Sequence, residues 1–413
     1  MQIEYDGGMM MTQKKILTTH VGSLPRTKTL LAANQSRLEG KITEADFNQV
    51  IEHSIDEVVK RQKAIGIDII NEGEYGHITS GAVDFGAWWN YSFYRLGGLE
   101  MTDEDRWAKQ DVVRSEPGKI KLTSFSDRRD RGLFREAYED PDSGVLGKRT
   151  AVGNPVFNGP VTYIGQEQVK RDVELLKAAM EKNGIEQGFM AAVSPGSAAR
   201  LEDRYYHDEV ALLNDLADAL HEEYQAITDA GIVLQLDAPD LAEAWDQINP
   251  EPSVEDFQAW MQLRIDAINR ALVGIDPELV RLHICWGSWH GPHTTDIPFE
   301  YIVDQCLQVN AAGFTFEASS PRHAHEWKVW AKEGRLKPGQ KIIPGLVSHS
   351  TNVVEHPELI ADRIVQFAEM VGPENVIAST DCGLGGRLHE QIAWAKLEAL
   401  QAGADLATQR LFG

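Results

Sequence analysis

The chain alternates between short apolar runs and longer amphipathic segments, and polar residues stand where the apolar runs end. The run at 67–70 leads to Glu74, and the run at 232–236 leads directly to Asp237. Such alternation is typical of a parallel α/β fold, in which helices connect and cover the strands. Eight or nine strand–helix units can be counted along the chain. This number favours a (β/α)8 TIM barrel over an open sheet.

Apolar periodicity defines the expected elements. The clearest helix covers 43–65, where Thr43 can cap the start and Gly66 can end the last turn. Further helices are predicted at about 166–183, 207–230, 254–273, 299–311, 357–370 and 388–402. Strands are predicted at 15–20, 67–70, 152–162, 188–193, 232–237, 281–285, 313–317, 341–347 and 376–382. This is one strand too many for an ideal barrel, and we place 152–162 outside it.

Two stretches do not follow the alternation. Residues 1–14 are polar, with two adjacent glycines and three consecutive methionines, and we expect them to form a flexible leader. Residues 80–148 are first aromatic and then charged, and we interpret them as an insertion after the second strand, over one mouth of the barrel. Its aromatic residues are explained equally well by a substrate entrance and by packing. The remainder, 15–413 with this insertion, is predicted to be a single barrel.

Composition limits the possible partners. A formal charge of −23 and a pI near 5.0 argue against nucleic acid and against an anionic membrane. Three cysteines are too few for a disulfide framework, which fits a reducing, cytoplasmic location. No apolar run approaches the length needed to cross a membrane. We therefore expect a small-molecule partner, and nothing in the sequence specifies an oligomeric state.

Four residues at predicted strand ends form a candidate metal site. His283 and Cys285 are two residues apart, so a strand directs both side chains to the same side. Glu317 and Cys382 end two later strands. One nitrogen, two sulfurs and one carboxylate oxygen make a plausible zinc site. Taken singly, His283 could be a hydrogen-bonded core residue and Cys285 a small buried one. The presence of two further potential ligands, Glu317 and Cys382, at the ends of distant strands favours a zinc site.

Other cysteines and histidines are weaker candidates for the metal site. Cys306 lies inside a predicted helix, where packing is the simpler explanation. His290 and His293 follow the zinc pair in a loop, and either a substrate contact or a solvated loop explains them. Other predicted strand ends carry further polar groups. In TIM barrels these ends form the active site, and here they carry His20, Glu74, Asp237 and Asp381.

Five segments together resemble the cobalamin-independent methionine synthase family, in particular its catalytic C-terminal barrel. They are Thr-Thr-His-Val-Gly-Ser-Leu-Pro at 18–25, Gly-Ile-Asp-Ile-Ile-Asn-Glu-Gly-Glu at 66–74, Gln-Leu-Asp at 235–237, His-Ile-Cys at 283–285 with Glu317, and Asp-Cys-Gly-Leu at 381–384. The resemblance spans about 15–400. The chain has no room for the family's additional N-terminal barrel. It is closer in length to single-barrel relatives, which include core methionine synthases and epoxyalkane:coenzyme M transferase.

The resemblance implies zinc-activated transfer of a methyl or other alkyl group to a thiol. Its zinc ligands would be His283, Cys285, Glu317 and Cys382, with Glu317 giving way to the substrate sulfur. Binding to zinc lowers the pKa of a thiol, which is about 8.5 when free. Homocysteine is the favoured acceptor and methionine the expected product.

The resemblance also assigns the homocysteine amino acid group to the residues at Ser23, Glu74 and Asp237. We add His20 to these substrate residues because it ends a strand at the same mouth. A simpler explanation for Glu74 and Asp237 is hydrogen bonding within the barrel mouth. The expected catalytic residues are Glu317, Asp237 and His283.

The alkyl donor and the thiol acceptor are less constrained than the metal ligands. Family members that use folate stack its pterin ring on a tryptophan, and residues 151–210 contain none, which argues against folate. A corrinoid-bound methyl group, an epoxide or another alkyl donor stays open. A sulfonate thiol such as coenzyme M would need cations, and Arg26, Arg322 and Arg387 are candidates. A zinc hydrolase or a structural zinc protein would also explain a zinc site, although two cysteines are unusual in a hydrolase.

Overall fold

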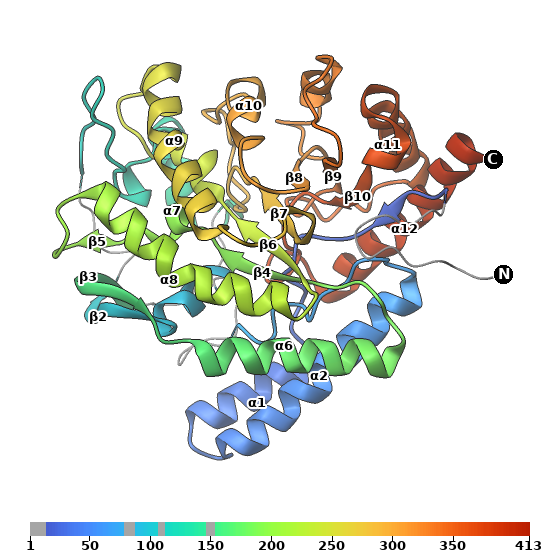
Figure 1. Ribbon diagram of the computed structural model, residues 1–413, viewed down its shortest axis with the longest axis horizontal. Coiled ribbons are helices and arrows are strands. Elements are labelled where there is room, and N and C mark those ends of the chain that lie inside the picture. The colour runs from blue at the N-terminus through green and yellow to red at the C-terminus, as the bar shows by residue number, and fades with distance from the viewer. Residues whose placement is uncertain (1–13, 78–86, 106–111, 146–152) are drawn as a thin grey trace.

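Seven strands form one curled parallel sheet at the centre of the protein (Figure 1). The structure is a computed structural model that describes residues 14–77, 87–105, 112–145 and 153–413. The predicted leader thus lies outside the described residues, except for its last position. The strand order is β1-β10-β9-β8-β7-β6-β4. The strands are β1 (Leu17–Thr18), β4 (Phe189–Val193), β6 (Val233–Asp237), β7 (Val280–His283), β8 (Gly313–Glu317), β9 (Lys341–Val347) and β10 (Ile377–Thr380).

The segment 67–70 lies between the two edge strands of this sheet. The Ile69 N–H donates a hydrogen bond of 3.0 Å to the Thr18 carbonyl in β1. On the other side, the Phe189 N–H of β4 donates one of 2.8 Å to the Ile70 carbonyl. The predicted second strand is therefore bonded to both edges. The fold is a mixed α/β fold with a curled parallel sheet, consistent with a TIM-like barrel.

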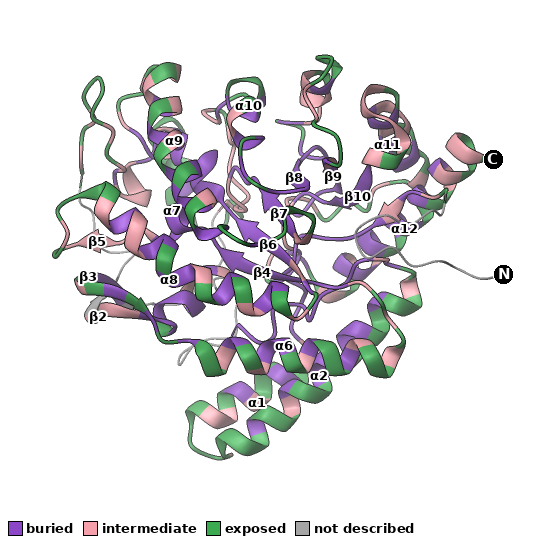
Figure 2. Ribbon diagram, viewed as in Figure 1, coloured by how far each residue is buried: buried purple, intermediate pink, exposed green. Residues whose placement is uncertain are grey.

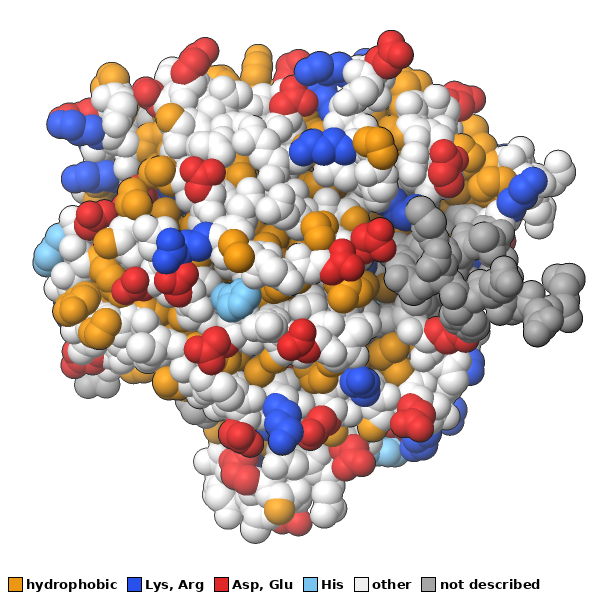
Figure 3. Space-filling view, viewed as in Figure 1, with side chains coloured by type: hydrophobic (Ala, Val, Ile, Leu, Met, Phe, Trp, Pro, Cys, Tyr) orange, Lys and Arg blue, Asp and Glu red, His pale blue; other side chains and the backbone are white. Residues whose placement is uncertain are grey.

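Long helices pack around the sheet with buried faces inward, except that the first of them packs on the second (Figure 2). They are α1 (Lys28–Leu38), α2 (Glu44–Ile65), α6 (Gln166–Asn183), α8 (Glu209–Asp229), α9 (Val254–Ala271), α11 (Pro357–Val371) and α12 (Glu390–Phe412). The predicted cap of α2 is confirmed: Thr43 and Asp46 form a capping box, and Gly66 ends the helix at φ 100°. Acidic and basic side chains are interspersed over the face drawn in Figure 3. Among the described residues, no helix is both long and apolar enough to span a membrane.

The prediction of one helix over 299–311 is wrong about its length. The structure has a 3₁₀ turn at Phe299–Tyr301 and one helical turn, α10, at Val303–Cys306. Side chains of α9 compete with the helical hydrogen bonds beyond this point. Asn269 donates to the Gln308 carbonyl at 3.0 Å and accepts from the Asn310 N–H at 2.8 Å. These bonds hold the segment in a turn instead of a continuing helix.

A second sheet lies outside the curled one, with the order β2-β3-β5. It contains β2 (Leu96–Asp105), β3 (Gly153–Tyr163) and β5 (Glu202–Asp203). Placing 152–162 outside the barrel is therefore confirmed for the described residues, because β3 pairs only with β2 and β5. Short helices complete the chain: α3 (Ala87–Asn90), α4 (Arg129–Leu133), α5 (Arg135–Glu139) and α7 (Pro195–Ala198).

The predicted insertion, 80–148, is described only in part, because 80–86, 106–111 and 146–148 lie outside the described residues. Its described part contacts the loop that follows β6. The Thr123 N–H donates to the Gln247 carbonyl at 2.9 Å, and the Ser115 N–H donates to the Asn249 carbonyl at 3.0 Å. This loop begins at the carboxyl end of β6, so part of the segment lies at the end of the sheet where the candidate site residues stand.

The interior of the curled sheet contains a buried cation beneath the candidate site. The Arg281 guanidinium lies 3.6 Å from the centroid of the Phe189 ring. It donates to Gln235 Oε1 at 2.9 Å, to Thr19 Oγ1 at 3.0 Å and to the His20 carbonyl at 2.8 Å. Burial lowers the pKa of Arg281 to about 9. These bonds tie β7 to β6 and to the chain just after β1.

Candidate functional site

Three of the four predicted zinc ligands converge at the carboxyl ends of β7 and β10. The potential ligand atoms of His283, Cys285 and Cys382 all lie within 4.8 Å of one another. His283 Nδ1 bonds to the Thr315 hydroxyl, which fixes the ring. Its Nε2 is buried and has no hydrogen-bond partner among the described residues. A buried ring nitrogen without a partner, next to two sulfurs, is the arrangement expected of a metal ligand.

The two cysteines contact each other directly. Their Sγ atoms are 3.8 Å apart, and the Gly287 N–H donates to Cys285 Sγ at 3.2 Å. The hydrogen bond between the thiols raises the pKa of Cys285 and lowers that of Cys382. Two adjacent thiols thus include one that ionises readily, and a bound cation would favour the thiolate form of both.

Glu317, the fourth predicted ligand, lies at the edge of this cluster. Its Oε1 is 3.9 Å from Cys285 Sγ and accepts a hydrogen bond of 3.3 Å from the Trp286 N–H. Burial raises the pKa of Glu317 to about 7. Its potential ligand atom also groups with those of His349 and Asp381, all within 4.8 Å. Glu317 therefore lies between two sets of candidate ligands.

His349 is a site residue that sequence reasoning missed. It is buried two residues after β9, and its Nδ1 has no hydrogen-bond partner among the described residues. Burial lowers the pKa of His349 to about 4, so the ring is neutral. Asp381 Oδ1 accepts from the Ala318 and Ser319 N–H groups at 2.9 and 2.8 Å. The signal that identified the other ligands, a polar residue after a strand, was also present at His349.

The predicted substrate residues lie around the same mouth. Glu74 and Asp237 are both buried, and Asp237 Oδ1 accepts from Gln235 Nε2 at 2.8 Å. Burial, followed by the charge of Asp237, raises the pKa of Glu74 well above its ordinary value. Burial also raises the pKa of Asp237 to about 6. The Glu74 backbone is held at φ 61°, in the left-handed region that is strained for this residue type. Two buried carboxyls with raised pKa values lie in this region, and a cationic ligand would favour their ionised forms.

His20 lies below the mouth and is held on both sides. Its Nε2 is 2.8 Å from Gln62 Oε1, and its Nδ1 accepts from the Gly22 N–H at 3.2 Å. Because Nδ1 accepts, Nε2 carries the proton and donates to Gln62. Burial lowers the pKa of His20 to about 3, so the ring is neutral. Its proposed contact with substrate stays a prediction, and the structure places it where it fixes the backbone beside Ser23.

The loop after β7 packs over a hydrogen-bonded series of histidine and carboxylate side chains. His323 Nε2 and His293 Nδ1 lie 3.0 and 3.1 Å from Asp296 Oδ2, and His323 Nδ1 lies 2.9 Å from Glu326 Oε2. Both ring nitrogens of His323 therefore face carboxylates. These carboxylates raise the pKa of His323 to about 10 despite its burial. The His323 ring stacks on Trp286 at 4.2 Å, so a cationic group supports the residue that contacts Glu317.

Asp130, in α4 within the predicted insertion, anchors this loop. It is fully buried and accepts hydrogen bonds from the Thr294 N–H and hydroxyl, at 2.9 and 2.8 Å. It also accepts from the His293 N–H at 3.2 Å and from the Tyr138 hydroxyl at 2.8 Å. The Tyr138 oxygen in turn accepts from Trp289 Nε1 at 2.8 Å. The position of the loop after β7 thus depends on a residue far away in the sequence.

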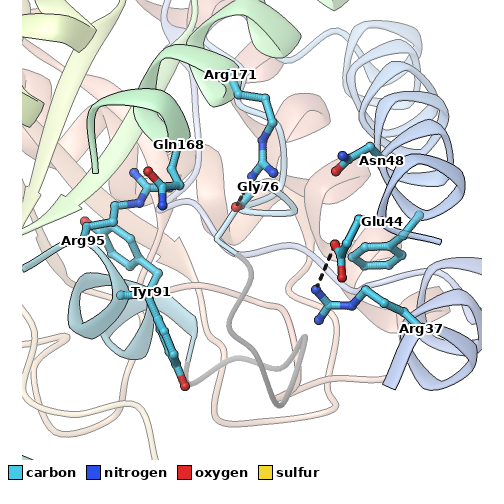
Figure 4. A pocket seen from close by; sticks show the side chains of 10 residues that line it. Arg37, Glu44, Asn48, Gly76, Tyr91, Arg95, Gln168 and Arg171 are labelled. Atoms are coloured by element: carbon cyan, nitrogen blue, oxygen red, sulfur yellow. Dashed lines mark hydrogen bonds and ion pairs between the residues drawn. The ribbon is translucent and has the colours of Figure 1, made fainter. Parts of the chain in front are cut away.

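A separate pocket of about 180 Å³ lies outside the metal cluster (Figure 4). Residues of α1, α2 and α6 face one another across it, and Arg37 pairs with Glu44 at its edge. None of its lining residues belongs to the candidate metal site. The lining consists of Arg37, Glu44, Phe47, Asn48, Gly76, Tyr91, Tyr94, Arg95, Gln168 and Arg171.

Comparison with known proteins places the chain in a family. The family model described as "Cobalamin-independent synthase, Catalytic domain" matches residues 16–83 and 147–405. The unmatched stretch between them, 84–146, lies within the insertion predicted from the sequence.

Individual relatives are distant but cover nearly the whole chain. The chain is 22% identical over 395 residues to the uncharacterized protein YxjG of Bacillus subtilis (strain 168), covering 91% of this chain and 90% of that protein. It is 22% identical over 398 residues to a methionine synthase of Thermococcus kodakarensis, covering 95% and 94%. Its fold is similar to that of a B12-independent methionine synthase from Shewanella sp. W3-18-1 in complex with selenomethionine, with a TM-score of 0.67, 18% identity, and coverage of 96% and 99%. Because the family model matches most of its length, the chain belongs to the cobalamin-independent methionine synthase family and carries its catalytic domain.

Proposed function

We propose that the protein is a zinc-dependent methyltransferase that transfers a methyl group to the thiol of homocysteine and forms methionine. The observation that carries this proposal is the convergence of His283, Cys285 and Cys382, within 4.8 Å, beside the buried carboxylate of Glu317. Membership of the family supports the same reaction. In the reaction, the homocysteine sulfur loses its proton and forms a bond to the methyl carbon, and the donor keeps the electron pair of the bond that breaks.

The four predicted ligands, His283, Cys285, Glu317 and Cys382, would hold the zinc ion. Their donor set of nitrogen, sulfur and oxygen fits zinc, and the unpartnered His283 Nε2 supports this assignment. When bound, zinc would lower the pKa of the substrate thiol so that it reacts at neutral pH. Glu317 is the residue that we expect to make room for the substrate sulfur. It lies at the edge of the cluster, and the Trp286 N–H still binds its carboxylate there.

Ser23, Glu74 and Asp237 would orient the amino acid group of homocysteine. Glu74 and Asp237 supply two buried carboxyls for the ammonium group, and pairing with a cation would favour their ionised forms. His20 would hold the backbone of this pocket through its bond with the Gly22 N–H. The methyl donor is not assigned, and turnover with a folate, a corrinoid-bound methyl group and other alkyl donors would distinguish these classes.

We also propose that the curled sheet is a complete (β/α)8 barrel within a single domain at 15–413. Support for an eighth strand comes from the segment 67–70, which is hydrogen-bonded to both β1 and β4. Residues 80–148 would be an insertion after this strand. The unmatched stretch at 84–146 supports that assignment.

Zinc X-ray absorption on the purified protein, with and without homocysteine, tests the function. We expect stoichiometric zinc whose coordination shell gains one sulfur and loses one light ligand when homocysteine is added. An unchanged shell would reject homocysteine as the acceptor and leave the metal site standing. Absence of zinc after zinc-supplemented expression would reject the metal site itself.

A further inference from the structure

The pocket between α1, α2 and α6 has a lining in which positive charge exceeds negative charge (Figure 4). Among the described residues, three arginines line it, Arg37, Arg95 and Arg171, against a single carboxylate, Glu44. The Glu44 side chain is 71% exposed, and its Oε2 lies 3.6 Å from Arg37 Nη1, so water screens its charge. The pocket thus offers a ligand more cations than anions.

The carboxylates that balance two of these arginines lie outside the lining. Arg95 donates to Glu223 Oε1 at 3.2 Å and also pairs with Asp172. Arg171 donates from Nη2 to Asp172 Oδ1 at 3.0 Å. The side chains of Asp172 and Glu223 are both 1% exposed, and neither lines the pocket. They fix the two guanidinium groups from behind, so a ligand in the pocket would meet the arginines before these carboxylates.

Several hydrogen-bond donors of the lining are unused. Arg171 uses Nε and Nη2 for Asp172 and the Gly76 carbonyl, and its Nη1 has no partner in the described part of the chain. The side-chain amides of Gln168 and Asn48 likewise bond to no residue that the structure describes. Gln168 and Arg171 are three residues apart on α6, so they share a face of that helix. Asn48 extends from α2 on the side facing Arg171 (Figure 4). Donors from two helices therefore border the same space.

The size of the pocket and its access to solvent suit a small polar ligand. Its volume of about 180 Å³ is far more than one water molecule needs. Glu44 and Asn48 are exposed members of the lining, so the pocket opens to solvent. The Tyr91 hydroxyl is already engaged, because it accepts from the Val193 N–H at 3.0 Å. The Gly76 carbonyl is engaged by Arg171 at 3.4 Å. The charged groups available to a ligand are therefore chiefly donors.

We propose that this pocket binds a small oxyanion, a phosphate or a carboxylate, between Arg171, Gln168 and Asn48. Phosphate and carboxylate oxygens are the acceptors that match a guanidinium group, and amide N–H groups donate to the same oxygens. Arg37 adds positive charge from α1. A cation would find only the screened carboxylate of Glu44 in the described lining. The site is separate from the candidate metal cluster, and its ligand need not take part in methyl transfer.

Titration calorimetry of the zinc-loaded protein with inorganic phosphate and, separately, with acetate tests this site in a buffer without other oxyanions. Three variants each make the net charge more negative by one unit: Arg171→Gln, Gln168→Glu and Lys170→Gln. Lys170→Gln is the control, because Lys170 is an exposed residue of the same helix that does not line the pocket. Gln168→Glu removes no side-chain hydrogen bond to a described residue, so it still answers if Arg171→Gln does not fold.

Phosphate or acetate should bind to the unaltered protein, and both Arg171→Gln and Gln168→Glu should weaken that binding roughly tenfold or more. The tighter of the two anions identifies the preferred class of ligand. Lys170→Gln should change the affinity by less than about 2-fold, because solvent screens an exposed charge.

Three results would overturn the proposal. Equal losses in all three variants would show general electrostatic attraction instead of a site. Binding that survives both Arg171→Gln and Gln168→Glu would place the anion elsewhere in the protein. The third is the absence of binding by either anion at concentrations up to roughly 10 mM.

Discussion

The Sγ atoms of Cys285 and Cys382 lie 3.8 Å apart, although β8 and β9 separate the two strands that lead to them. Strands in a flat sheet are about 4.8 Å apart, so three steps would place these residues roughly 14 Å from each other. The curl of the sheet is what brings the two thiols into contact. The candidate metal site therefore depends on the fold as a whole and not on one local motif.

Replacement of one thiol tests this dependence. Cys382→Ala should lose most of its bound zinc, because a soft ligand is removed while the strands and helices are unaffected. Metal content by mass spectrometry, together with circular dichroism for the fold, measures both effects. Cys306→Ala is the matched control, since Cys306 is buried in α10 and should keep full zinc. Stoichiometric zinc in the Cys382 variant would remove that residue from the ligand set.

Glu317→Gln separates metal binding from thiol binding. Three ligands stay in place, so the variant should retain zinc. The affinity of the variant for homocysteine should differ roughly tenfold from that of the unaltered protein. The reason is that a neutral amide competes with the substrate sulfur for the metal position differently from a carboxylate. Calorimetric titration of zinc-loaded protein gives this value. Unchanged affinity and turnover would count against the exchange role of Glu317.

Asp237→Asn should weaken an amine-bearing thiol much more than an amine-free one. The substitution keeps the shape of the side chain and removes one of the two carboxyls that we propose as partners of the ammonium group. We expect a loss of roughly 10-fold or more for homocysteine and little change for 4-mercaptobutyrate. Equal losses for both ligands would contradict an ammonium-binding role.

Because Glu72 is buried, we expect the free energy of unfolding to depend on pH. Burial raises the pKa of Glu72 from an ordinary value of 4.5 to about 7. The protonated form therefore contributes stability that is complete below about pH 4.5 and is lost as the pH rises through 7. Glu72→Gln should remove this dependence and gain at most about 3 kcal/mol of unfolding free energy at pH 8 relative to pH 5. Denaturant unfolding of both proteins at the two pH values measures the difference. A stability gain that is the same at both would show that Glu72 does not titrate in this range.

Local patterns were sufficient to predict β7, β10 and most of the helices. The convergence of His283 and Cys285 was predictable from their spacing at the end of a strand, although β7 itself ends at His283. The capping box of α2 was predictable because it depends on neighbouring residues. The exclusion of 152–162 followed from a count of strands. These predictions needed no knowledge of distant contacts.

Other features depend on contacts that no local pattern contains. The helix expected at 299–311 stops early because Asn269, on another helix, takes over its hydrogen bonds. Asp130 looked like one charge among many in a polar stretch, yet it is fully buried against Thr294. His349 is different, because it follows a correctly predicted strand and could have been found by the same rule as Cys382.

The anchoring of the loop after β7 by Asp130 has a consequence for folding kinetics. Asp130 and Thr294 are 164 residues apart in sequence, so a large chain loop must close before their hydrogen bonds form. The helices around the sheet depend mainly on local contacts and should form earlier. During refolding from denaturant, we therefore expect zinc affinity to return in a slower phase than helical circular dichroism. Asp130→Asn should slow or abolish that phase while leaving the faster one in place.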